Sequence, residues 1–387
     1  MIASRIESRD SLAYVVGARP NFMKMVPVVR AMRSALPGWA HSVVHTGQHY
    51  DFGLSEVFVE ELELTPPDFR LEIGSGSHGA QTARALERIE PILSEIRPAA
   101  VVVAGDVNST LAAALAAAKL EIPVAHVEAG LRSFDRSMPE EINRVLVDQI
   151  SEWCFTHSPE ADVNLVAEGV PPGKIHPVGN TMIDTLVALT PRVRPSPLAA
   201  RHRLEPGHYA LVTLHRPALV DGDLLDETLS ELAKLAATIP VVFPTHPRTR
   251  ERLPKGFAAP NLHLVPPVSY LEFLALQRDA RFVITDSGGV QEETTFLGIP
   301  CFTLRANTER PITIERGTNH LLGLDPGSIR SVPDRLDRLG PRDPVEIPGW
   351  DGHAAERIAE IMRRDLAPEA GSAARDLAVS HSGHVAS

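Results

Sequence analysis

The strongest constraint on the fold is a repeated alternation of short apolar runs with amphipathic helical patterns. The runs are continuously apolar, so the strands they predict must be covered on both faces, as in a parallel sheet flanked by helices. The runs of the first half are 13–19, 41–47, 99–106, 123–130 and 153–158, and those of the second half are 209–216, 239–246, 262–267, 281–289 and 299–305. The sequence therefore predicts two doubly wound, Rossmann-like α/β domains.

The segment 188–207 separates the two sets of runs. It contains several prolines and no hydrophobic periodicity, which indicates an interdomain linker. Because a chain of 387 residues is longer than a single hydrophobic core usually supports, two domains are also expected from the length. We expect an N-terminal Rossmann-like domain at 1–187, a second Rossmann-like domain at 208–350, a helix at 351–366 and a disordered polar tail at 367–387.

Composition excludes several classes of protein. The chain is 43% hydrophobic and 22% charged, as in ordinary soluble proteins, and its formal net charge of −11 argues against a nucleic-acid partner. The start MIASRIESRD has no apolar core, and the alanine-rich run 111–118 is too short to span a bilayer. The two cysteines, Cys154 and Cys301, lie in strand-like runs and do not suggest disulfides or a thiolate metal site. We expect a cytoplasmic protein without a membrane partner.

Charged and imidazole side chains recur where the predicted strands end. In parallel α/β sheets, ligands bind beyond the carboxyl ends of the strands. The residues in such places are Arg19, Asp106, Glu128 and His157 in the first half, and His215, His246 and Asp286 in the second. Two facing sets predict a site in the cleft between the domains.

The segment 126–144, HVEAGLRSFDRSMPEEINR, is the most highly charged of these places. A structural interpretation is a capped helix start, in which Ser137 and Glu140 form a capping box and Arg144 pairs with Glu140 four residues away. That interpretation leaves Glu128 unexplained. A functional role for the segment therefore stays open beside the structural one.

The segment DSGGVQEE, 286–293, follows a predicted strand and opens a helix. Ser287, Gly288 and Gly289 place free backbone N–H groups at a helix N-terminus, which favours an anion, and Glu293 could bind a ribose diol. This combination suggests a nucleoside diphosphate, although a bare Gly-Gly is also typical of a tight βα turn. His215, past another strand, is either a structural histidine or a group that stabilises a departing phosphate oxygen.

Two other patterns are interpreted as structural. The segment GSGSHG, 74–79, matches a dinucleotide-binding pattern, but it does not follow the first strand and lacks an acidic residue at the expected distance. His41, His45 and His49 recur every four residues, but they span a strand and a turn rather than one helix face. We expect no cofactor and no metal ion.

With these residues in place, the chain resembles the non-hydrolysing UDP-N-acetylglucosamine 2-epimerases over nearly its whole length. The motifs that carry the resemblance occur in the same order: GARPNFMKMVP, TGQHYD, GDVNST, HVEAGLRSFDRSMPEEINRVLVD, VGNTMID, TLHRP, TDSGGVQEE and LRANTERP. The resemblance implies the GT-B architecture, in which two Rossmann-like domains enclose the active site and a C-terminal helix returns to the first domain. It implies a UDP-sugar substrate, and we expect a homodimer.

The resemblance also implies roles for individual residues. The residues that correspond to the family's catalytic positions are Asp106, Glu128, Glu140 and His215. Those expected to hold UDP are Arg19, Ser287, Gly288, Gly289 and Glu293, with Phe273 near the uracil and Arg310 at the phosphates. Further candidates for substrate binding are Lys24, Arg132, Arg144 and His246.

The chemistry expected from these residues is inversion at C2 of UDP-N-acetylglucosamine. The C2 hydrogen is not next to a carbonyl, so its removal must be coupled to departure of UDP from C1, which gives a glycal that UDP later attacks again. Asp106 and Glu128 would share the proton transfers, in an order left open. Glu140 would orient these groups through Arg132 or Arg144, and the arginines of 126–144 would keep Glu128 and Glu140 ionised. The alternatives are a hydrolysing epimerase, an epimerase of a related diacetamido sugar, a GT-B glycosyltransferase and a non-catalytic UDP-sugar sensor.

Overall fold

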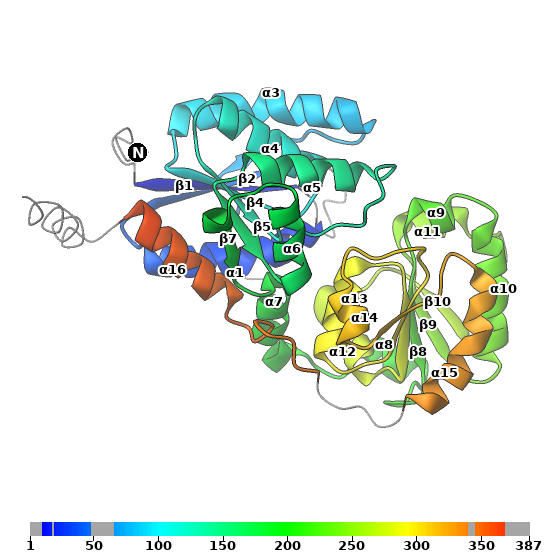
Figure 1. Ribbon diagram of the computed structural model, residues 1–387. Coiled ribbons are helices and arrows are strands. Elements are labelled where there is room, and N and C mark those ends of the chain that lie inside the picture. Colours follow the sequence, from blue (N-terminus) through cyan, green and yellow to red (C-terminus); the bar gives the residue numbers. More distant parts are fainter. Residues whose placement is uncertain (1–9, 18, 48–65, 340–344, 368–387) are drawn as a thin grey trace, which may run out of the picture.

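The computed structural model describes residues 10–17, 19–47, 66–339 and 345–367, and two parallel sheets organise them (Figure 1). In the first sheet the strand order is β3-β2-β1-β4-β5-β6-β7. Its strands are β1 (Ser11–Val16), β2 (Ala40–His45), β3 (Phe69–Arg70), β4 (Ala100–Ala104), β5 (Val124–Val127), β6 (Trp153–Thr156) and β7 (Ile175–Pro177). The order reverses between β1 and β4, which is where such sheets bind ligands.

The second sheet repeats this arrangement with the order β10-β9-β8-β11-β12-β13. Its strands are β8 (Ala210–Thr213), β9 (Val241–Pro244), β10 (Leu262–Val265), β11 (Phe282–Thr285), β12 (Cys301–Thr303) and β13 (Asn319–Leu321). All strand pairs in both sheets are parallel. The predicted class, two Rossmann-like α/β domains in the GT-B architecture, is confirmed.

Helices cover both faces of each sheet, as the continuously apolar strands require. On β1, Leu12, Tyr14 and Val16 face one core cluster, whereas Ala13 and Val15 face another. The helices up to the second sheet are α1 (Arg19–Ala35), α3 (His78–Ile96), α4 (Asn108–Lys119), α5 (Pro139–Ile150), α6 (Pro159–Ala167), α7 (Thr181–Leu189) and α8 (Pro197–Arg201), with 3-10 turns at Pro172–Lys174 and Thr190–Arg192.

The helices of the second half follow the same pattern. They are α9 (Pro217–Val220), α10 (Leu224–Ala236), α11 (Pro247–Arg252), α12 (Tyr270–Asp279), α13 (Gly288–Phe296), α14 (Ile312–Glu315), α15 (Val332–Arg338) and α16 (Ala354–Leu366), with a 3-10 turn at Pro326–Ser331. None of the described helices is both long and apolar enough to cross a membrane.

The last helix, α16, lies beside α1 of the first sheet (Figure 1). Its Ile358 and Met362 belong to the core cluster that contains Leu12. Asp184 of α7 fixes the start of α16, because its carboxylate accepts hydrogen bonds from the backbone N–H groups of residues 354 and 355, at 3.1 and 2.6 Å. The chain therefore returns to the first sheet after completing the second.

The stretch predicted as a linker, 188–207, is more ordered than its sequence suggested. It contains the end of α7, a 3-10 turn and α8, which Ser196 caps by accepting from the N–H of Ala199 at 3.1 Å. The domain limits stay a prediction, and most of the tail expected at 367–387 lies outside the described residues. The sequence also missed β3, β7 and β13, since edge strands of two or three residues leave no periodic pattern.

Helix α5 is amphipathic in the opposite sense to most surface helices. It buries Glu141, Arg144 and Asp148 and exposes Ile142, Leu146 and Ile150, whose exposed fractions are 41%, 47% and 37%. The predicted capping box is wrong. The helix begins at Pro139 after Met138, and the Ser137 hydroxyl donates to Asp135 instead, at 2.6 Å. The charged face turns inward because its side chains form ion pairs with groups in the interior.

Candidate active site

Glu128 is the first residue after β5 and is buried between the two sheets. Its φ of +69° lies in the left-handed region, an uncommon and strained conformation for a residue with a side chain. Beside it, Gly105 has a φ of +65°, and a Cβ there would lie 3.1 Å from Lys24 Nζ and 3.5 Å from Glu128 Oε2. Gly105 therefore provides both the turn and the room for an ion pair between Lys24 and Glu128.

Two cations hold the Glu128 carboxylate. Lys24 pairs with Oε2, and Arg310 Nη2 donates to Oε1 at 2.5 Å. Burial alone would raise the pKa of Glu128, but Lys24 and Arg310 lower it below its ordinary value. Glu128 is therefore an ionised, buried carboxylate. The expectation that Arg132 and Arg144 supply its counter-charge is wrong, since both cations come from distant parts of the chain.

Arg132 instead supports the end of β5 from behind. Its guanidinium donates to Glu168 at 2.7 and 2.5 Å and pairs with Asp148 at 2.7 Å. Asp148 also pairs with His126 Nδ1 at 2.6 Å, and the other ring nitrogen of His126 lies 2.8 Å from the carbonyl of Gly105. The network fixes the backbone beneath Glu128, and the structure does not bring Arg132 to that carboxylate.

Asp106, past the end of β4, is held by α5. Arg144 donates from Nη2 and Nε to Asp106 Oδ2, the Nε contact being 3.1 Å, and Asn143 donates to the Asp106 carbonyl at 2.8 Å. Burial would lower the pKa of Arg144, but Asp106 and Glu309 raise it, so the guanidinium remains charged. The Asp106 side chain keeps 27% of its surface exposed. It is fixed and still reachable by a ligand.

The two glutamates that begin α5 have different environments. Glu141 is buried and accepts from the N–H and hydroxyl of Ser133, both at 2.9 Å, and from the N–H of Phe134 at 2.8 Å. Arg144 Nη1 donates to it at 2.7 Å, so the expected pairing of Arg144 with Glu140 is wrong. Glu140 is half-buried and makes no hydrogen bond or ion pair with another described residue. Its carboxylate is left available.

His215 and Asp286 stand side by side at the ends of β8 and β11. His215 Nδ1 lies 2.9 Å from Asp286 Oδ1, while the backbone N–H groups of His215 and Arg216 donate to Oδ2 at 2.8 and 2.7 Å. The His246 ring is 5.6 Å from that of His215, centroid to centroid. Because an ionised carboxylate only accepts hydrogen bonds, a hydrogen bond in this pair would be donated by Nδ1 and would leave Nε2 as the ring nitrogen for a ligand.

The N-terminus of α13 lies against a buried guanidinium. Ser287 precedes the helix, and a Cβ on Gly288 would come within 2.5 Å of Arg310 Nη1, so a larger residue there would displace the guanidinium. Backbone N–H groups beside a cation favour a diphosphate. The next glycine, Gly289, lies close to Met182 of α7.

Two other predicted UDP contacts lie in the second domain. Glu293 accepts from the Tyr270 hydroxyl at 2.8 Å, and Phe273 is half-buried against the core cluster around Tyr209. The side chain of Arg19, which begins α1, lies outside the described part of the structure. Its predicted contact with UDP stays a prediction.

Three buried residues of the site were missed as ligand-binding candidates: Glu292, Glu309 and the previously noted strand-end residue His157. Glu309 accepts from Arg305 and Arg310, each at 2.6 Å, and these cations hold its pKa well below the ordinary value despite burial. Glu292 and Glu309 lie inside the motifs DSGGVQEE and NTERP. The motifs therefore marked both glutamates as part of the site. The spacing of the residues in the motifs did not show which carboxylate faces the other domain.

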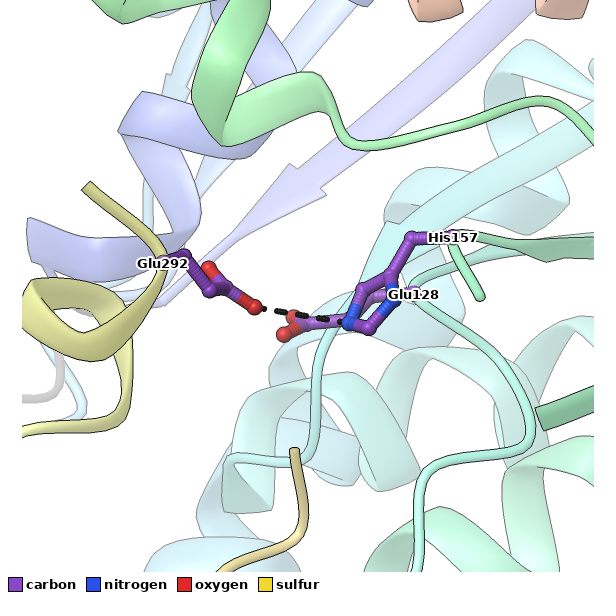
Figure 2. A group of neighbouring side chains, drawn as sticks. All are labelled: Glu128, His157 and Glu292. Atoms are coloured by element: carbon purple, nitrogen blue, oxygen red, sulfur yellow. Dashed lines mark ion pairs between the residues drawn. The ribbon is translucent and has the colours of Figure 1, made fainter. Parts of the chain in front are cut away.

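Glu128, His157 and Glu292 present ligand-type atoms within 4.8 Å of one another (Figure 2). A divalent cation could use such donors. However, both oxygens of Glu128 and one oxygen of Glu292 already accept from Lys24 or Arg310. A metal ion would have to displace a buried cation, so the donor set favours an ionic network.

Comparison with known proteins identifies the family. The model of the family described as UDP-N-acetylglucosamine 2-epimerase matches residues 34–363. The chain belongs to the UDP-N-acetylglucosamine 2-epimerase family. This confirms the resemblance drawn from the motifs.

Individual members of the UDP-N-acetylglucosamine 2-epimerase family are similar over nearly their whole length. A Methanocaldococcus jannaschii protein named UDP-N-acetylglucosamine 2-epimerase is 41% identical over 365 residues, 91% of this chain and 98% of that protein. A crystal structure of the M. jannaschii enzyme in complex with UDP-GlcNAc and UDP has a TM-score of 0.82 at 41% identity, covering 91% of this chain and 99% of that one. A Pseudomonas aeruginosa UDP-2,3-diacetamido-2,3-dideoxy-D-glucuronate 2-epimerase is 40% identical over 358 residues, 90% of this chain and 98% of that protein.

Proposed function

We propose that this protein interconverts UDP-N-acetylglucosamine and UDP-N-acetylmannosamine by inversion at C2, without net hydrolysis. The observation that carries the proposal is the buried Glu128 carboxylate, kept ionised by Lys24 and Arg310 beside a helix N-terminus suited to a diphosphate. An ionised carboxylate can accept a proton, and the neighbouring guanidinium and N–H groups can stabilise a departing UDP. The M. jannaschii relative, crystallised with UDP-GlcNAc and UDP, supports the substrate class.

The proposed reaction has two stages. In the first, a carboxylate takes the C2 proton, the C2–H electrons form a C1–C2 double bond, and the C1–O bond breaks to release UDP. In the second, a UDP oxygen attacks C1 while a proton returns to C2 from the opposite face. Asp106 and Glu128 are assigned the proton transfers, because both are fixed acids or bases at neighbouring strand ends.

Other groups are assigned to UDP and to the geometry. His215, whose Nδ1 is held by Asp286, is assigned to the departing phosphate oxygen through Nε2. Arg310 and residues 287–289 are assigned to the diphosphate, Glu293 to the ribose and Phe273 to the uracil. Glu140 is assigned a catalytic supporting role, since its carboxylate has no described protein partner.

A second candidate is epimerisation of a UDP-diacetamido uronic acid. The P. aeruginosa relative with that name is 40% identical, nearly as similar as the M. jannaschii enzyme. Both reactions invert C2 of a UDP-sugar and need the same carboxylates. They differ in the groups at C3 and C6 of the sugar, so a direct comparison of the two substrates separates them.

The first experiment is proton NMR of the protein with UDP-N-acetylglucosamine in heavy water. We expect a UDP-N-acetylmannosamine signal to grow, with deuterium at C2 of both sugars, because the proton removed at C2 exchanges before it returns. Free N-acetylmannosamine with UDP would indicate a hydrolysing enzyme. No change with this sugar and turnover of the diacetamido uronate would establish the second candidate.

We also propose that the protein is a homodimer that covers the apolar face of α5. Three aliphatic side chains on that face, Ile142, Leu146 and Ile150, are exposed in the single chain, and a self-complementary stripe of this kind is typical of two-fold interfaces.

A cytoplasmic location belongs to the same proposal. The two cysteines, Cys154 and Cys301, are buried as free thiols.

Leu146→Lys should convert the dimer to a monomer, because it places a charge at the centre of the stripe. The measurement is molar mass by light scattering after size exclusion. Ile314→Lys is the matched control, since Ile314 is 38% exposed on α14 of the other domain. A wild-type protein that is already monomeric at micromolar concentration contradicts the proposal.

A further inference from the structure

Glu292 and His157 meet across the two domains, close to Glu128. Figure 2 shows the His157 ring and the two carboxylates turned toward one another, with His157 Nε2 at 3.4 Å from Glu292 Oε1. His157 follows β6 of the first sheet, and Glu292 lies on α13 of the second. Both are buried, with exposed fractions of 4% and 0%. The pair is therefore a contact between domains inside the candidate active site.

Arg310 links this pair to Glu128. Its guanidinium donates in three directions: Nη2 to Glu128 at 2.5 Å, Nε to Glu292 at 2.6 Å and Nη1 to Glu309 at 2.6 Å. A guanidinium is planar and its donors point in fixed directions. Three acceptors therefore define its position. Glu292 and Glu309 fix Arg310 from the second domain, and the remaining edge meets Glu128 of the first.

The Glu292–His157 contact is costly for the fold. Among the described residues, Glu292 Oε2 and both ring nitrogens of His157 have no hydrogen-bond partner. Trp350 packs edge-on against the His157 ring, and its Nε1 donates to the His157 carbonyl at 2.9 Å. The ring is thus held in place by its surroundings although its nitrogens are poorly satisfied. Buried polar groups left in this state call for a role beyond stability.

We propose that Glu292 is a positioning residue for the epimerisation: set against His157 of the other domain, it fixes the Arg310 guanidinium on the Glu128 carboxylate. This inference rests on the proposed function. Glu292 acts through Arg310 and does not touch the reacting carbon. His157 and Glu128 both belong to the other domain, so the geometry at Glu128 is completed only when the two domains are together.

The variant that tests the inference is Glu292→Gln, which keeps the shape of the side chain and removes its charge. We expect kcat to fall about 10- to 100-fold, as small misplacements of a catalytic group do, while the Kd for UDP changes less than about threefold. Glu231→Gln is the matched control, because Glu231 is a buried carboxylate paired with Arg330 and Lys234 away from the site. It should leave kcat unchanged.

The pH profile separates positioning from a general loss of structure. Glu128 faces Lys24 of α1, Arg310 after β12, Glu292 of α13 and His157 after β6. The negative charge of Glu292 raises the pKa of Glu128 and Arg310 lowers it, so Glu292→Gln, which removes the first and loosens the second, should displace the acidic limb of kcat/KM from its wild-type position. A variant that only lost stability would leave the limb in place.

The His157→Asn variant tests the partner from the other domain. If His157 and Glu292 act as one unit, the double variant His157→Asn/Glu292→Gln should lose no more kcat than the more impaired of the two single variants. If Glu292→Gln does not fold, Glu292→Asp replaces it. That variant keeps the charge but moves it one methylene away from Arg310, so it should lower kcat and, by loosening Arg310 from Glu128, move the acidic limb to higher pH.

Three results would overturn the inference while wild-type protein still epimerises its substrate. They are wild-type kcat in the Glu292 variants, additive effects of His157 and Glu292, and loss of wild-type turnover on chelation with recovery on adding Zn²⁺. The last would indicate a metal site at Glu128, His157 and Glu292. Absence of turnover in the wild-type protein would instead count against the proposed function.

Discussion

Glu128→Gln should lower the rate of C2 epimerisation about 100- to 10,000-fold and leave UDP binding within about threefold of wild type. Glutamine preserves the length of the side chain, but it cannot accept the C2 proton at neutral pH. The measurements are turnover by NMR and the Kd for UDP by calorimetry. Exchange of the C2 hydrogen for deuterium should disappear together with turnover.

The control for Glu128→Gln is Glu152→Gln, which removes a carboxylate from a partly exposed ion pair with Lys174 away from the candidate site. It should behave as wild type, because exposed pairs contribute little. Asp106→Asn is the companion variant at the second carboxylate. Intact turnover in both Glu128→Gln and Asp106→Asn, with UDP binding unchanged, would remove these residues from the mechanism.

The neighbouring glutamates of α5 should separate function from stability. Glu141→Gln should lower the free energy of unfolding by about 3 kcal/mol, because the amide repels some of the buried donors that Glu141 satisfies: the N–H and hydroxyl of Ser133, the N–H of Phe134, and Arg144. Glu140→Gln should change that energy by less than about 0.5 kcal/mol. Turnover should show the opposite order, with Glu140→Gln losing about 100-fold or more in a correctly folded protein.

Chemical denaturation, with both variants measured at the same pH, reports the free energies, and single-turnover kinetics report the chemical step. Each glutamate serves as the matched control for the other, since the substitution is identical and the positions are adjacent. A large loss of stability in Glu140→Gln, or wild-type stability in Glu141→Gln, would contradict the hydrogen-bond pattern around α5. If Glu140→Gln and Glu141→Gln were equally stable and lost turnover equally, the assignment of a catalytic role to Glu140 and not to Glu141 would be contradicted.

The sequence predicted the interior of the fold well and its edges poorly. Continuous apolar runs such as 99–106 became central strands, because a strand buried on both faces admits only apolar side chains. The short edge strands β3 and β13 were not predicted, since they are half-covered and have too few residues for a pattern. The return of the chain to the first sheet as α16 followed from the family resemblance rather than from periodicity.

Helix α5 shows where periodicity stops being informative. Ile142, Leu146 and Ile150 recur every four residues, and Glu141, Arg144 and Asp148 recur every three or four, so each set forms a stripe along a helix. Periodicity shows that the helix has two different faces, but it does not show which of them is buried. Here buried partners such as Asp106 and Arg132 turn the charged stripe inward. The apolar stripe is left outside for a second copy in the proposed dimer.

By itself, the sequence determined the α/β class, the strand ends that carry Asp106, Glu128 and His215, and the family, because these depend on local patterns and on motifs. Only the tertiary structure decided which cation meets which carboxylate. Lys24 and Arg310 are 104 and 182 positions from Glu128, and Glu292 lies beyond the linker. The packing of one domain against the other determines which charged groups pair. The spacing of residues along the chain does not reveal these pairings.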